Sequence, residues 1–162
     1  MTYLIEIIQD GFFAAIAAIG FSSISNPPRN AYGWCAGIAA VGHITRYILT
    51  HNPYGNAHII FASLVAAFAI GLLAVWLAPR AKCPAETFSF PALLPMIPGM
   101  YAYRTVEALV LCLGSHTEAD FNHYFYLFSS NGLTCTFIVA GMVMGVTVPI
   151  FLFKKISFHA TR

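Results

Sequence analysis

The chain has 162 residues, of which 59% are hydrophobic and only 9% are charged. Soluble domains carry about 25% charged residues, so a soluble fold of this length could not bury so much apolar side chain. The formal net charge of +2 is scattered along the chain, and no basic patch indicates a nucleic-acid partner. The composition therefore predicts a protein whose solvent is partly lipid.

Five apolar segments are long enough to cross a bilayer. A membrane-spanning helix needs about 20 such residues to cover about 30 Å of hydrocarbon. In chain order the segments occupy residues 3–24, 32–50, 57–78, 88–113 and 124–153. The loops between them are rich in turn residues and too short to hold a soluble domain. We therefore predict an all-α integral membrane bundle of five spans, with residues 1–162 forming a single transmembrane domain.

The positive charges predict an orientation. They occur in the first loop, the third loop and the tail, as Arg29, then Arg80 and Lys82, then Lys154, Lys155 and Arg162. The second and fourth loops contain neither Lys nor Arg. Because cytoplasmic loops carry an excess of Lys and Arg, we predict an outside N-terminus and a cytoplasmic C-terminus.

The fourth segment contains the stretch PALLPMIPGMYAYR, with prolines at 91, 95 and 98. Each proline inside a continuous helix costs about 3 kcal/mol. Irregular backbone at membrane depth is tolerated only inside protein or beside a water-filled cavity. We therefore predict a discontinuous span whose second half begins near Pro98, which suits the first turn of a helix. A kinked or re-entrant structural helix remains an alternative.

Such a half-helix would carry free amide groups around Gly99 to Tyr101, pointing toward the membrane centre with partial positive charge. Secondary transporters bind anionic substrate groups at helix ends of this kind. We assign Pro98, Gly99, Met100 and Tyr101 to substrate binding on this basis.

Several polar residues are predicted to lie at a similar depth. At about 1.5 Å per residue, His43 lies near the midplane, and Asp10, Arg46 and Arg104 lie in the outer half. The last segment adds Ser129, Ser130, Asn131 and Thr134 to this layer. A charge at the bilayer centre costs about 2.5–3.5 kcal/mol on insertion scales, which favours a functional role.

We assign Arg46, Arg104 and Asn131 to substrate binding, and Asp10 and His43 to proton coupling because each can change charge. Other interpretations stay open. Arg46 could snorkel to the surface, Asp10 could be interfacial, and Arg104 could simply neutralise Glu107 three residues later. The serines and threonines could be helix-packing groups.

Cysteine and histidine spacing predicts no metal site and no cofactor. The four cysteines, Cys35, Cys83, Cys112 and Cys135, form no CxxC pair and are interpreted as small packing residues. The six histidines form no HExxH pattern. No nucleophile–base pair can be identified, so we do not expect an enzyme.

Short motifs along nearly the whole chain resemble one family. They are the QD pair ending at Asp10, AIAAIGF ending at Phe21, the Asn26–Pro27 turn, WCA from Trp34, GHITR ending at Arg46, LLPMIPGMYAY over 93–103, and Asn131. In these motifs the chain is similar to the threonine/serine exporter family. Within it, the chain resembles the small subunit that corresponds to the second half of full-length exporters.

The resemblance implies proton-coupled export of small hydrophilic metabolites across a bacterial inner membrane, with threonine, serine or a short dicarboxylate as substrate. It also implies a partner, a five-span membrane protein equivalent to the first half of the exporter. Two halves with odd numbers of spans would be inverted relative to each other, a common transporter plan. A non-transporting assembly or stabilising subunit is the alternative, and an intramembrane enzyme is a third.

Overall fold

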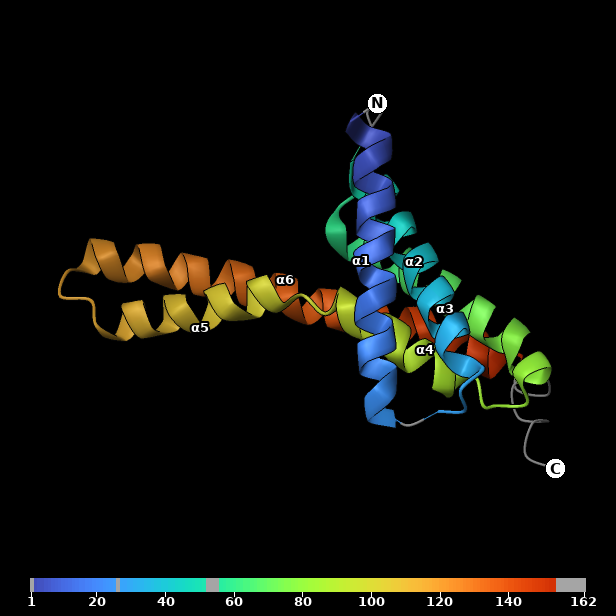
Figure 1. Cartoon of the computed structure of the whole chain (residues 1–162). Helices are drawn as coiled ribbons and strands as arrows, with labels where there is room; N and C mark the ends of the chain where they lie inside the picture. The colour runs from blue at the N-terminus through green and yellow to red at the C-terminus, as the bar shows by residue number, and fades with distance from the viewer. Residues whose placement is uncertain (1, 26, 52–55, 154–162) are drawn as a thin grey trace. The chain divides into compact units, whose positions relative to one another are not determined.

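A computed structural model describes residues 2–25, 27–51 and 56–153, and within these ranges the chain is helical without strands (Figure 1). The helices are α1 (Thr2–Ser25), α2 (Ala31–Thr50), α3 (Ile59–Ala81), α4 (Glu86–Leu93), the 3-10 helix η1 (Leu94–Met96), α5 (Gly99–Leu113) and α6 (Glu118–Leu152). The chain divides into two units, which are described separately. Unit 1 is Met1–Met96 with Gly141–Arg162, and unit 2 is Ile97–Ala140.

Unit 1 has a core of small residues. Alanine is the commonest residue at its fully buried positions, as at Ala18, Ala39 and Ala66, and a few large side chains such as Phe88 are buried among them. Many other large apolar side chains point outward, with Phe12 60% exposed and Phe61 58% exposed. Helices in lipid associate through small residues that let backbones approach, because burial of large apolar groups gains nothing over lipid. The packing therefore fits a lipid-exposed bundle.

Two glycines mark the closest helix contact in unit 1. A Cβ on Gly71 of α3 would lie 2.7 Å from the Val146 carbonyl oxygen of α6. A Cβ on Gly145 would collide with the Leu64 carbonyl oxygen of α3. Both obstacles are backbone atoms, which cannot rotate away, so these positions require glycine for α3 and α6 to pack.

Unit 2 is a helical hairpin of α5 and the first part of α6, the yellow and orange helices in Figure 1. The Cys112 thiol lies 3.8 Å from the Phe121 carbonyl oxygen near the loop. The Thr105 side chain lies opposite Gly132. Most large side chains of this hairpin are exposed, including Met100, Tyr103, Val106, Val110, Leu113, Phe125, Tyr126 and Phe137. Two helices leave most of each other uncovered, so this unit presents apolar surface on nearly all sides.

Each predicted segment overlaps helix, but several bounds differ: segment 57–78 corresponds to α3, which ends at Ala81, and segment 88–113 corresponds to α4, η1 and α5. The last segment was predicted to start at residue 124, but α6 begins at Glu118. Thr117 caps it: its hydroxyl oxygen accepts a hydrogen bond from the Asp120 amide at 3.2 Å and donates to the Asp120 carboxylate at 2.6 Å. A Thr three residues before an acidic residue is a helix-start pattern. It was not recognised because the surrounding polar residues were interpreted as a loop.

Among the described residues, three helices are long and apolar enough to span a membrane by length and composition: Tyr3–Ile24, Ile59–Ala81 and Glu118–Leu152. The predicted second span, as α2, has suitable length but carries His43, Thr45 and Arg46. The predicted fourth span consists of shorter helices. Five spans therefore remain a prediction. The tail charges Lys154, Lys155 and Arg162, and the Asn26 turn residue, lie outside the described residues.

The proline-rich stretch is accommodated in two ways. Pro91 lies inside α4, where it cannot donate to the carbonyl of Thr87 four residues earlier. The Cys35 thiol of α2 lies 3.5 Å from that carbonyl oxygen and donates to it instead. Further on, η1 ends at Met96 and a new helix begins at Gly99 with Pro98 as its N-cap.

Candidate functional site

An acid and a histidine meet between α1 and α2 in unit 1. The Nδ1 atom of His43 lies 3.2 Å from the Oδ2 atom of Asp10. The His43 side chain is 8% exposed, and that of Asp10 is 32% exposed. The two residues are 33 positions apart in the chain, so only the packing of α1 against α2 joins them. Such a pair can hold or release a proton with little movement of heavy atoms.

The second ring nitrogen of His43 is also buried. Its Nε2 atom has no hydrogen-bond partner among the described residues. Buried polar atoms are normally paired, because an unpaired one costs about 1–3 kcal/mol. The Asp10–His43 pair therefore contains one buried ring nitrogen that no described residue satisfies.

Arg46 lies one helical turn beyond His43 on α2. Its Nη1 atom donates a hydrogen bond to the Met96 carbonyl oxygen at 2.9 Å. Met96 is the last residue of η1, so Arg46 satisfies a carbonyl at the end of the helical run that precedes Pro98. The sequence singled out Arg46 but did not reveal this partner, because a backbone carbonyl 50 residues away leaves no pattern.

A second polar pair extends the first along the same helices. The Tyr47 hydroxyl donates to the Glu6 carboxylate at 2.6 Å, and the Tyr47 ring stacks on His51 at 4.3 Å between centroids. Glu6 and Tyr47 were missed in the sequence. They could have been found by spacing, since each lies four residues from a member of the Asp10–His43 pair, on the same helix face.

Unit 2 contains a polar groove between α5 and α6, with a volume of about 480 Å³. It brings together Arg104 and Asn131, both predicted to bind substrate, with Ser130. The remaining lining residues are Glu107, Ala108, Leu111, Tyr124 and Leu127. Within the described part of the chain, no ion pair within 4 Å joins Arg104 to Glu107. The guanidinium and the carboxylate therefore both face the groove without neutralising each other directly.

The beginning of α5 differs from the prediction. The amides of Gly99 and Tyr101 are not free, because they donate to the carbonyl oxygens of Ile97 at 2.8 Å and Pro98 at 3.1 Å. Short local bonds of this kind tighten a helix start and use up its donors. Met100 is exposed, and a Cβ built on Gly99 meets no described atom within 4 Å.

The predicted residues thus fall into two groups. Asp10 and His43 meet in unit 1, with Arg46 one turn further along α2, whereas Arg104 and Asn131 line one groove in unit 2. Pro98 to Tyr101 form the start of α5. Three of the four cysteines, Cys35, Cys83 and Cys112, are buried, and all four carry free thiols.

Residues 10–152 match the family described as Threonine/Serine exporter, ThrE. The chain belongs to the threonine/serine exporter family. The match includes Asp10, the whole proline-rich stretch and the groove of unit 2. Family membership and the apolar helices together make the chain a membrane-embedded protein of a transporter family.

A relative extends this comparison. An uncharacterized protein of Haemophilus influenzae is 34% identical over 153 residues, which cover 94% of this exporter-family chain and 50% of the relative. The chain therefore spans about half the length of the curated relative it matches. No solved structure matches the chain.

Proposed function

We propose that the chain is one half of a two-component secondary exporter of small hydrophilic carboxylates, such as threonine, serine or a short dicarboxylate. The observation that carries the proposal is the family match over residues 10–152. We place the exporter in a bacterial inner membrane, with five spans, an outside N-terminus and a cytoplasmic C-terminus, as the loop charges predict.

A partner subunit is supported by the surface of unit 2. The groove of the hairpin exposes Arg104 and Glu107, which lipid cannot solvate. Protein or a water-filled cavity must face this groove if the hairpin lies at membrane depth, and a five-span first half is our candidate for the covering protein. The H. influenzae relative, of which this chain matches about half, is long enough to hold both halves in one polypeptide.

Substrate binding is assigned to the groove of unit 2. Arg104 can hold a carboxylate with two parallel hydrogen bonds. The side-chain amide of Asn131 already donates to the Leu127 carbonyl at 2.8 Å, which fixes its orientation and leaves its oxygen available to an ammonium group. Ser130 adds a hydroxyl. These groups suit an amino acid. The Pro98 to Tyr101 segment begins the same hairpin, at the start of α5.

Proton coupling is assigned to Asp10 and His43. Protonation of Asp10 would remove the negative charge beside His43, and Arg46 lies one turn further along the same helix. Arg46 holds the end of η1 through Met96. A change at Asp10 is thereby linked, through one arginine, to the interruption before α5.

The test is metabolite export from cells. Cells expressing the chain, its partner, both or neither are loaded with threonine, serine or a short dicarboxylate, and efflux is measured. We expect efflux only with both proteins, and only under a proton gradient. Efflux with this chain alone would remove the half-exporter proposal. Intact efflux from the partner alone would favour an assembly or stabilising subunit.

A further inference from the structure

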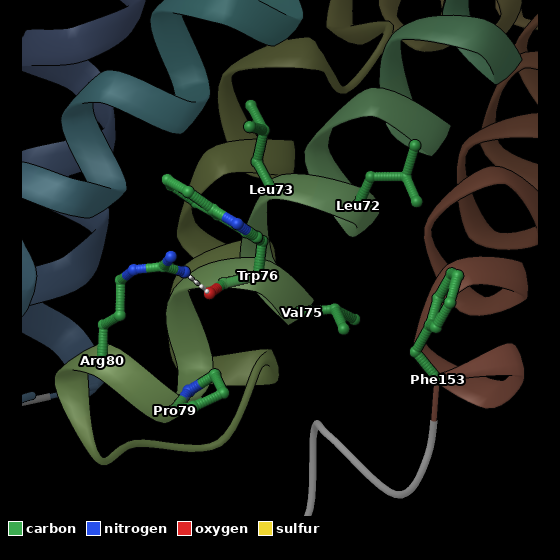
Figure 2. A pocket seen from close by; sticks show the side chains of 7 residues that line it. All are labelled: Leu72, Leu73, Val75, Trp76, Pro79, Arg80 and Phe153. Atoms are coloured by element: carbon green, nitrogen blue, oxygen red, sulfur yellow. Dashed lines mark hydrogen bonds between the residues drawn. The ribbon is translucent and has the colours of Figure 1, made fainter.

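A groove lies at the end of α3 in unit 1, away from the polar pair of α1 and α2. It has a volume of about 610 Å³, within the usual range of small-molecule sites. Figure 2 shows its side chains, from α3 on one side and Phe153 on the other. The lining residues are Leu72, Leu73, Val75, Trp76, Pro79, Arg80 and Phe153. All except Arg80 are apolar, which suits a hydrocarbon chain.

The charged end of the groove has a defined geometry. The guanidinium of Arg80 lies 3.7 Å from the centroid of the Trp76 ring, and its Nη1 donates to the Trp76 carbonyl oxygen at 2.7 Å (Figure 2). Stacking and this bond hold the planar cation in place while using one of its five N–H donors. Within the described residues no carboxylate lies within 4 Å of Arg80.

The position of Arg80 along the helix indicates which kind of anion its guanidinium would bind. Arg80 is next to the last residue of the candidate span Ile59–Ala81, and Trp76 lies one turn before it. Tryptophan and arginine at the end of a span lie at headgroup depth. A ligand that is apolar beside Leu72 and anionic beside Arg80 therefore has the shape and charge of a phospholipid.

We propose that this groove binds one anionic phospholipid, with an acyl chain along Leu72 and Phe153 and the phosphate on Arg80. Basic residues beside apolar grooves between membrane helices recognise lipid headgroups through charge. The proposal rests on membrane insertion, not on the exporter function, so the two can fail independently.

The test uses quenching of Trp76 fluorescence by lipids with brominated acyl chains. The purified full chain carries Trp34→Phe, so that Trp76 is the remaining tryptophan. Brominated phosphatidylglycerol and brominated phosphatidylcholine compete with their unlabelled forms. We expect the anionic lipid to be preferred by about fivefold, the effect of one cation beside a headgroup with net negative charge, because the choline of phosphatidylcholine offsets its phosphate. Equal quenching by both lipids would indicate ordinary surrounding lipid and would overturn the proposal.

Two variants test whether Arg80 causes the preference for the anionic lipid. Arg80→Gln should reduce the anionic-to-zwitterionic preference to about one, while Arg29→Gln, which removes another exposed charge outside the groove, should leave it unchanged. A preference that survives Arg80→Gln contradicts the proposal. Release of the lipid by inorganic phosphate alone would make this a simple anion site and would also contradict it, as would protection of Trp76 from both lipids by a protein partner.

Discussion

The two units differ in how they keep polar side chains away from lipid. Unit 1 packs alanines and glycines inside and places its polar pair, Asp10 and His43, between two helices. Unit 2 buries few residues and leaves Arg104 and Glu107 facing an open groove. A bundle can supply its own environment for polar groups, whereas a hairpin needs another protein. The contrast suggests that unit 1 is the self-sufficient part and unit 2 the part that is completed by a partner.

The largest expected effect comes from breaking the packing of unit 1. Gly145→Leu would push a side chain into the Leu64 carbonyl, and we expect a loss of about 3 kcal/mol of stability. The matched change is Gly99→Leu in unit 2, where the described residues leave open space. It should insert and fold normally, and it should reduce export by filling the open space beside the start of α5 that substrate or the partner would enter. The measurements are thermal stability in detergent and efflux. Equal stability losses in both variants would contradict the difference between the units.

The next effect separates function from stability in unit 1. Asp10→Asn keeps the size of the side chain and an acceptor for His43, so we expect a stability change of about 1 kcal/mol. Proton-driven export should be lost, since Asn cannot titrate. Efflux is measured from pH 5.5 to pH 8.5, roughly the range in which histidine changes charge. Normal efflux by the Asp10→Asn variant across that range would show that Asp10 has a structural role only.

A smaller effect is expected in the groove of unit 2. Arg104→Lys keeps the charge but loses the planar fork, so apparent substrate affinity should fall by about tenfold, or about 1.4 kcal/mol. Partner association should persist, and Arg29→Lys serves as the control at an exposed arginine outside the groove. If Arg104 only balances the charge of Glu107, lysine will suffice and the affinity will not change.

The predicted orientation is tested by labelling cysteines and not by measuring export. Cys83 would be a natural probe for the third loop, but its thiol is buried and lies 3.3 Å from the Ala81 carbonyl. The exposed Glu86→Cys and Glu118→Cys, each in a cysteine-free chain, probe the third and fourth loops instead. An impermeant thiol reagent should label only position 118 in intact cells. Label on position 86 before permeabilisation would reverse the proposed topology.

Local pattern was enough to predict most helix positions, since apolar runs and loop prolines bound α1, α2 and α3 closely. Depth along the helices also predicted that Asp10 and His43 belong to one layer, and they are in contact. The bond from Arg46 to Met96 was not predictable, because a backbone acceptor carries no residue signature. The prediction that the amides of Gly99 and Tyr101 are free was wrong, because both donate hydrogen bonds to nearby backbone carbonyl oxygens.

The small-residue core of unit 1 determines which mutations the protein can tolerate. Fully buried positions of α3, such as Ala62, Ala66 and Ala74, already hold nearly the smallest side chain. A buried leucine can lose atoms and leave a cavity, but these alanine positions can change almost only to a larger side chain. Accepted variation should therefore concentrate on outward positions such as Phe61, where lipid adapts to any apolar shape.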